Sequence, residues 1–141
     1  MERIRSRIFT IDEANQLLPY LDEALERLAS LGREVTGLKR EIDILRAIAG
    51  SGASTTNTDL SALGDKEASY DGAVERFRSA LADVSRHGCI IRDLDLGLVD
   101  FYTMSKDQIV CLCWKRGEPK IEHWHPLDEG FSGRRPIEEL R

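Results

Sequence analysis

Two cysteines and two histidines stand out in the stretch CLCWKRGEPKIEHWH, because each pair is separated by one residue and the pairs flank a turn-like segment. Cys111 and Cys113 lie in an apolar run, and His123 and His125 follow the segment KRGEPK. Thiolates and imidazoles are ligands that zinc prefers, so these four residues could hold a divalent metal. In a strand, residues two apart project to the same face about 6.5–7 Å apart. The pairs share a face if the loop holds an odd number of residues, and the sequence leaves this open.

A packed β-hairpin is the interpretation that we favour for this stretch. Tetrahedral zinc needs its thiolates less than about 4 Å apart, so a flat strand with one intervening residue chelates poorly. Cysteine also packs readily as a small buried hydrophobe. We therefore expect no cofactor, and we keep a divalent metal on Cys111, Cys113, His123 and His125 as an alternative. A cysteine nucleophile paired with a histidine is a further alternative, which no flanking signature supports.

A second group of polar residues falls near the expected strands and the C-terminal segment. Its members are Asp95, Asp100, Glu118, His125 and Arg134. In a structural interpretation Asp93 and Asp95 bind turn amides near Gly97. Arg134 then pairs with Asp100 or Glu118, and His125 forms a hydrogen bond across the hairpin. In a functional interpretation the residues converge where the sheet meets the C-terminal loop and form a site for a small polar ligand. His125 and Glu118 could then act as acid and base, and a carboxylate–histidine metal site is a variant of this idea.

A long helix should precede these residues. Thr10 followed by Glu13 forms a capping-box pattern, which predicts a helix start. Apolar residues then recur at intervals of three and four from Leu21 to Ala49, which is typical of an amphipathic, coiled-coil-like seam. Pro19 lies beyond the first turn, so it predicts a kink or a restart of the helix.

A second helix should return to complete a hairpin over residues 10–87. The glycine- and serine-rich segment 50–58 predicts a mobile tip between the two helices. The second helix should end near His87, which we expect to interact with the C-terminal dipole, with Gly88 as a left-handed cap.

The pattern changes to short β-rich runs after Gly88. Four runs separated by turn residues predict an antiparallel meander over 88–126. The run Ile109–Trp114 is apolar without alternation, which indicates a central strand buried on both faces. The hairpin can cover one face, and the other face needs a closing segment at 127–141 or a second subunit. We expect an α+β fold in a single domain, 1–141, with a long antiparallel helical hairpin packed on a small four-stranded antiparallel β-meander.

Composition narrows the possible environments and partners. The 141 residues carry a net charge of −5, with a pI near 5.3, which argues against nucleic-acid or anionic-membrane partners. No apolar stretch reaches the roughly 18 residues that span a bilayer, and the N-terminus lacks the apolar core of a signal peptide. We expect the three cysteines to be reduced thiols, which favours a location in the cytoplasm.

The long apolar seam and the lack of a catalytic signature favour a non-enzymatic interaction or scaffold protein. Such a protein would act as a homodimer, and it could also bind a further protein partner. The alternative is a small metal- or ligand-binding enzyme with its polar site at the junction of sheet and C-terminal loop.

Four motifs carry a resemblance to a known family. FTIDEANQLLP, DLDLGLVDF, LCWKRGE and WHPLDEGFSGRRPI follow one another along nearly the whole chain. Together they resemble the prokaryotic family catalogued as domain of unknown function 2203. The resemblance implies no particular activity, because that family has no established substrate or cofactor. Cys111 and His123 look peripheral to its motifs. The residues that lie on them are Cys113, Trp114, Gly117, Glu118, Trp124, His125, Gly130, Phe131, Gly133 and Arg134.

Overall fold

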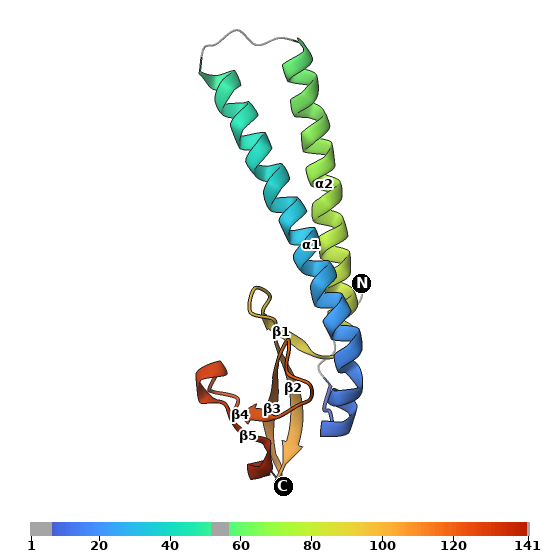
Figure 1. Ribbon diagram of the computed structural model, residues 1–141, viewed down its shortest axis with the longest axis vertical. Coiled ribbons are helices and arrows are strands. Elements are labelled where there is room, and N and C mark those ends of the chain that lie inside the picture. Colours follow the sequence, from blue (N-terminus) through green and yellow to red (C-terminus); the bar gives the residue numbers. More distant parts are fainter. Residues whose placement is uncertain (1–6, 52–56, 141) are drawn as a thin grey trace. The chain divides into compact units, whose positions relative to one another are not determined.

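The computed structural model describes residues 7–51 and 57–140. Within these ranges the chain forms two long helices, a five-stranded antiparallel sheet and two short 3-10 helices (Figure 1). The elements are α1 (Ile11–Gly50), α2 (Asn57–Ser85), β1 (Ile90–Asp93), β2 (Leu98–Ser105), β3 (Gln108–Lys115), β4 (His123–His125), η1 (Phe131–Gly133), β5 (Arg135–Pro136) and η2 (Ile137–Leu140). The α+β class and the antiparallel meander are confirmed. The predicted count of four strands is one too low, because Arg135–Pro136 pairs with β4 as a short fifth strand.

The predicted start of α1 is confirmed in detail. The Thr10 hydroxyl accepts a hydrogen bond from the Glu13 N–H at 3.0 Å, and the Glu13 carboxylate accepts one from the Thr10 N–H at 2.8 Å. α1 then continues without a break through Pro19, so the predicted restart there is wrong. Pro19 itself is exposed, whereas Leu18 and Leu21 beside it are buried. Their packing offsets the single hydrogen bond that a proline removes.

Replacing Thr10 with alanine should lower the free energy of unfolding by about 1 kcal/mol, because the Glu13 N–H loses its capping acceptor. Urea denaturation measures the change. Thr10→Ser keeps a hydroxyl and should retain most of the stability. Equal losses in both variants would contradict a capping role.

The chain divides into two compact units. One comprises the residues up to Glu26 and from Leu81 onward, and the other comprises Arg27–Ala80. Both α1 and α2 contribute residues to each unit. Neither helix combines enough length with enough apolar character to cross a bilayer, as far as the described residues extend.

The Arg27–Ala80 unit is a pair of helices with an apolar seam. Its buried apolar side chains are Leu28, Leu31, Ile42, Ala73 and Ala80. Ion pairs join the helices at Glu34–Arg76 (2.8 Å) and Glu41–Lys66 (2.6 Å). Because exposed ion pairs contribute little, the seam provides most of the stability. The tip predicted at 50–58 lies partly outside the described residues, and its last two residues, Asn57 and Thr58, belong to α2.

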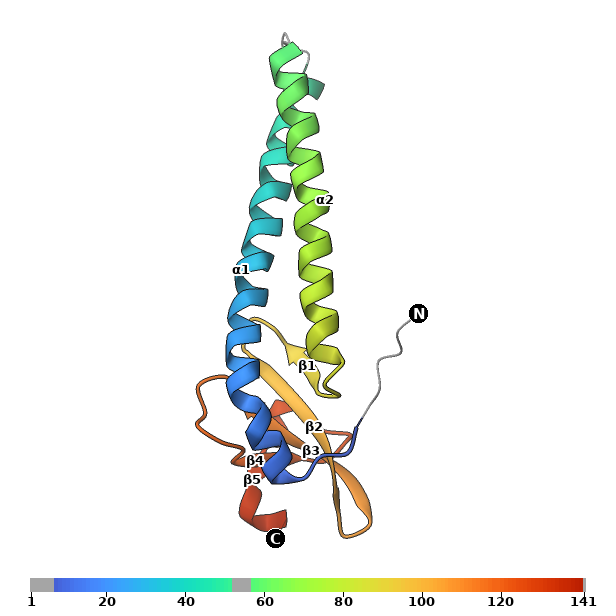
Figure 2. The same ribbon diagram turned by 90° about the vertical axis from the view of Figure 1, so that its right-hand side faces the viewer.

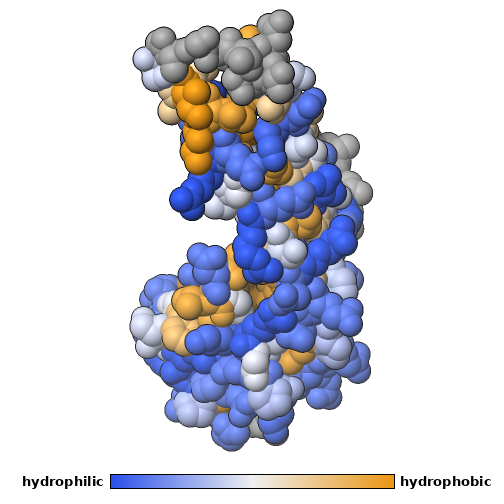
Figure 3. Space-filling view, turned by 45° about the horizontal axis from the view of Figure 1, so that its top comes forward, coloured by the Kyte–Doolittle hydropathy of each residue, from blue (hydrophilic) through white to orange (hydrophobic). Residues whose placement is uncertain are grey.

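The seam ends before the helices do. Ile44, Ile48 and Leu60 leave about half of their surface exposed, at 52%, 47% and 53%. Figure 3 shows apolar atoms gathered next to the grey residues at this end of the hairpin. The distal part of the unit therefore presents apolar side chains to solvent.

The sheet lies in the other unit, where the first turns of α1 cover one face (Figures 1 and 2). The strands follow sequence order, so β3 is central. Val110 to Trp114 are all buried, which confirms the predicted central strand, although Ile109 is 40% exposed. Phe101 on β2 meets Phe9 edge-on at 5.1 Å between ring centroids. Because strand residues alternate in direction, Asp100 and Tyr102 project from the opposite face.

A second set of contacts fixes the turn between β3 and β4. The Arg116 side chain donates to Asp22 and Glu26 of α1, each at 2.9 Å, and its backbone N–H donates to the Gly97 carbonyl at 2.9 Å. Gly97 has φ +70°, and a Cβ at this position would lie 2.7 Å from the Arg116 Cβ. A glycine is therefore required where β2 begins. The turn after α2 is also as predicted, since Gly88 has φ +89°.

Candidate functional site

A buried carboxylate–histidine pair lies on the face of the sheet away from α1. His125 Nε2 is 2.9 Å from Asp100 Oδ2, and each residue is 2% exposed. The two side chains come from β4 and β2 and meet across β3, because Asp100 is the register partner of Cys113 and His125 that of Cys111. Arg92 Nε donates to the same Asp100 oxygen at 2.9 Å.

The surroundings of the imidazole determine which nitrogen carries hydrogen. His125 Nδ1 lies 2.8 Å from the carbonyl oxygen of Pro126, and a carbonyl can only accept a hydrogen bond. Nδ1 must therefore be the N–H nitrogen. Nε2 then faces a carboxylate oxygen, which is also an acceptor in its ionised form. Their approach to 2.9 Å requires a proton or a cation between them.

Cys113 completes a group of three possible ligands. The ligand atoms of Asp100, Cys113 and His125 all lie within 4.8 Å of one another, and all three residues are buried. Burial raises the pKa of Cys113 to about 12, and the negative charge of Asp100 adds to this effect. Burial likewise raises the pKa of Cys111 to about 11. At neutral pH both thiols are neutral and therefore poor nucleophiles, which disfavours the cysteine-nucleophile alternative.

The pair lines a cavity of about 270 Å³. Residues of the strands and of the segment after β4 make up the lining. The lining residues are Arg92, Leu98, Asp100, Cys113, His125, Leu127, Asp128, Glu129, Gly130 and Phe131. The cavity thus combines buried charge with apolar surface.

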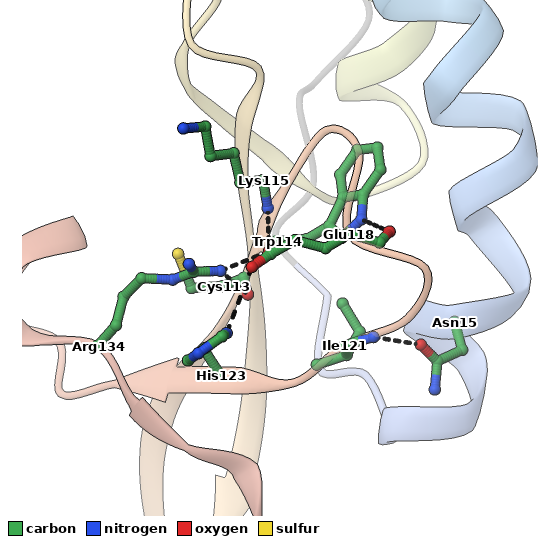
Figure 4. A network of polar contacts seen from close by, with 8 residues as sticks. All are labelled: Asn15, Cys113, Trp114, Lys115, Glu118, Ile121, His123 and Arg134. Carbon is green, nitrogen blue, oxygen red and sulfur yellow. Dashed lines mark hydrogen bonds and ion pairs between the residues drawn. The ribbon is translucent and has the colours of Figure 1, made fainter.

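A second polar network lies beside the cavity (Figure 4). The Glu118 carboxylate accepts hydrogen bonds from Arg134 Nη2 at 2.5 Å and from the Lys115 N–H at 2.6 Å. Arg134 also donates to the Cys113 carbonyl at 3.2 Å. His123 Nδ1 lies 3.4 Å from Glu118, without hydrogen-bond geometry. The network joins the β3–β4 turn to the C-terminal segment, so its role is structural.

The electrostatics of Glu118 follow from these contacts. Burial opposes ionisation of the carboxyl, but the hydrogen bonds from Arg134 and the Lys115 N–H outweigh it and lower the pKa below the ordinary 4.5. A lowered folded pKa means that ionised Glu118 stabilises the fold above that ordinary value. The contribution is lost as the pH falls through the lowered pKa.

Glu118→Gln should reduce the free energy of unfolding by about 1–3 kcal/mol at about pH 7, because Arg134 loses a partly buried charged partner. The difference from wild type should shrink as the pH falls below the ordinary 4.5 and through the lowered pKa, because Glu118 itself then takes up a proton. Urea denaturation at about pH 7 and over a series of acidic pH values measures this. Glu129→Gln breaks the more exposed pair with Arg135 and should change stability by less than about 1 kcal/mol. A pH-independent loss in Glu118→Gln would contradict the ion-pair account.

The structure sorts the residues predicted for the site into three groups. Asp100 and His125 line the cavity, whereas Glu118 and Arg134 form the neighbouring network, and both groups touch Cys113. Asp95 is exposed in the turn between β1 and β2 and is not among the described residues that line the cavity. Glu118 is held by Arg134, so the polar pair in the cavity is Asp100 with His125.

The register of the β3–β4 hairpin follows the odd-loop alternative. Cys111 lies opposite His125 and Cys113 opposite His123, so all four side chains share one face. Among the described residues, however, the ligand atoms that gather belong to Asp100, Cys113 and His125, and Cys111 and His123 are not part of this group. Sequence reasoning missed Arg92. A register shift between Ile91 and Asp93 places it beside Asp100, and no local pattern marks such a bulge.

The fold and cavity define an α+β protein in which a helical hairpin accompanies an antiparallel sheet with a buried carboxylate–histidine pair. A family model described as "Uncharacterized conserved protein (DUF2203)" matches residues 7–137. The chain therefore belongs to the DUF2203 family, as its motifs indicated. A search among curated proteins and a search among solved structures each found no match.

Proposed function

We propose that this protein binds a small polar ligand in the cavity beside Asp100 and His125. The observation that supports the proposal is the position of this pair, with Arg92, in the wall of a cavity. Burying charged groups costs free energy, and apolar residues stabilise a core at least as well. A charged, hydrogen-bonded group that faces a cavity is therefore better explained by recognition than by packing.

The lining indicates the character of the ligand. Arg92 and His125 offer polar contacts, whereas Leu98, Leu127 and Phe131 present apolar surface. A volume of about 270 Å³ lies near the lower end for ligand pockets. The ligand should be a metabolite-sized molecule with one polar end and one apolar face.

Thermal unfolding in the presence of small carboxylic acids, amines and phosphate esters tests the proposal. At least one compound should raise the Tm of the wild-type protein, because binding to the folded state alone stabilises it. Asp100→Asn should abolish the increase, as should Leu127→Trp, which fills the cavity without touching its charges. Asp95→Asn and Leu96→Trp are the matched controls, since both positions are exposed outside the cavity. An increase that survives both cavity variants would refute binding at this position.

The distal part of the hairpin supports a second role, the homodimeric interaction expected from the seam. Ile44 and Ile48 lie one turn apart on α1 and are half exposed. The same surface carries Lys39, Arg40 and Asp43. In a two-fold arrangement each copy meets the same patch of the other, so basic residues of one copy can lie opposite the acidic residue of its partner. We propose that a second copy of the chain covers this face.

Light scattering at micromolar concentration tests the dimer. The wild-type mass should be twice 15.9 kDa, and an Ile44→Glu, Ile48→Glu double variant should give the monomer. Ile109→Glu, at an exposed position on the sheet, is the control and should leave the mass unchanged. A wild-type monomer would refute the proposal.

The cytoplasm remains our proposed location. Cys89, Cys111 and Cys113 are all buried as free thiols. Buried, unpaired cysteines suit a reducing compartment.

A further inference from the structure

We propose that Asp100, Cys113 and His125 bind one divalent transition-metal ion of the zinc class in the cavity that they line. The inference rests on the proposed function, because the metal and the ligand would share this cavity. Its ligands differ from the set kept as an alternative in the sequence analysis, since Asp100 takes the place of Cys111 and His123.

The geometry of the three side chains fits such an ion. Their ligand atoms lie within 4.8 Å of one another, and His125 Nε2 and Asp100 Oδ2 are 2.9 Å apart. Tetrahedral zinc, with bonds of about 2.0–2.3 Å, places its ligand atoms roughly 3.3–3.8 Å apart. Binding would therefore move the ligand atoms by up to about 1 Å. The ligands come from three adjacent strands, which hold a site more rigidly than loops do.

The orientation of His125 is an independent indication. Its Nδ1–H is directed at the Pro126 carbonyl, so Nε2 is the ring nitrogen that faces the Asp100 carboxylate. Histidines that bind metals usually donate their other N–H to a carbonyl or carboxylate, which fixes the tautomer and the ring. Nε2 and the Asp100 oxygen need a proton or a cation between them, and a divalent metal ion can take the place of that proton.

The donor types select the class of metal. One sulfur, one nitrogen and one oxygen suit zinc, cobalt or iron better than magnesium or calcium, which prefer oxygen ligands alone. A metal ion displaces the proton of a thiol that it binds, so Cys113 and Asp100 would together supply two negative charges to balance a divalent ion. Arg92 orients the Asp100 carboxylate from outside, and Arg134 holds the Cys113 carbonyl in place.

The number of ligands leaves the site open on one side. Three protein ligands leave a fourth tetrahedral position, as in catalytic rather than structural zinc sites. Because Asp100, Cys113 and His125 all line the cavity, this position would face it. The polar end of the proposed ligand, or a water molecule, could then bind the metal directly.

Titration of the full chain with Co²⁺ after removal of bound metal tests the inference. One equivalent per chain should bind, with the near-ultraviolet absorption of a cobalt–sulfur bond. Cys113→Ser should remove this absorption, whereas Cys111→Ser, in which the neighbouring thiol is changed, should keep it. Arg92→Gln should weaken binding about 10- to 100-fold, as expected for a residue that orients a ligand. Far-ultraviolet circular dichroism confirms that each variant is folded.

Three outcomes would overturn the inference: no cobalt–sulfur absorption in the wild type, absorption that persists in Cys113→Ser, or absorption that is lost in Cys111→Ser. Leu127→Trp separates the two proposals, because it should keep the cobalt spectrum and abolish the response to polar ligands. A wild-type protein that responds to those ligands without binding Co²⁺ would overturn the metal site and leave the ligand site intact.

Discussion

Burial of β3 on both faces is the constraint on which the sheet unit depends. Every residue from Val110 to Trp114 is buried, so each face of the strand needs its own cover. The first turns of α1 cover one face (Figure 2). On the other face the polypeptide after β4 folds back over the sheet, and it leaves a cavity instead of a continuous apolar layer. The cavity therefore exists because the segment after β4 covers the second face of the sheet incompletely.

Two polar groups lie on either side of Cys113, and they differ in how their charges are satisfied. Glu118 receives hydrogen bonds from a guanidinium and a backbone amide of the elements it joins, which is the pattern of a structural brace. Asp100 and His125 instead contact each other, and both line the cavity. Glu118, by contrast, is held by Arg134 in the neighbouring network.

Local signals in the sequence predicted the local structure well. The Thr10–Glu13 capping box and the Gly88 cap depend on neighbouring residues, so their patterns are visible in a short window. β5 was missed because a two-residue strand has no periodicity, and its pairing depends on the chain returning to β4. The restart expected at Pro19 failed because tertiary packing overrides a local propensity.

The candidate site was predictable only in part, because its members meet across strands. Asp100 and His125 were recognised by residue type, but their contact depends on a register set by the β3–β4 turn. Arg92 lies beside Asp100 because of the register shift in β1, which the sequence does not reveal. Asp95 was predicted for the site from its charge, but it is exposed to solvent. Residue type identifies the chemistry that is available, whereas long-range pairing decides which residues share it.

The division of the chain also bears on how such proteins can vary in length. The sheet unit is closed by residues on both sides of Arg27–Ala80, so that helical pair is an insertion within it. Removing or adding whole heptads in both helices together would preserve the spacing of the seam. Every residue that lines the cavity lies outside the insertion. A change in the length of this helical pair would therefore leave the residues that line the cavity unchanged.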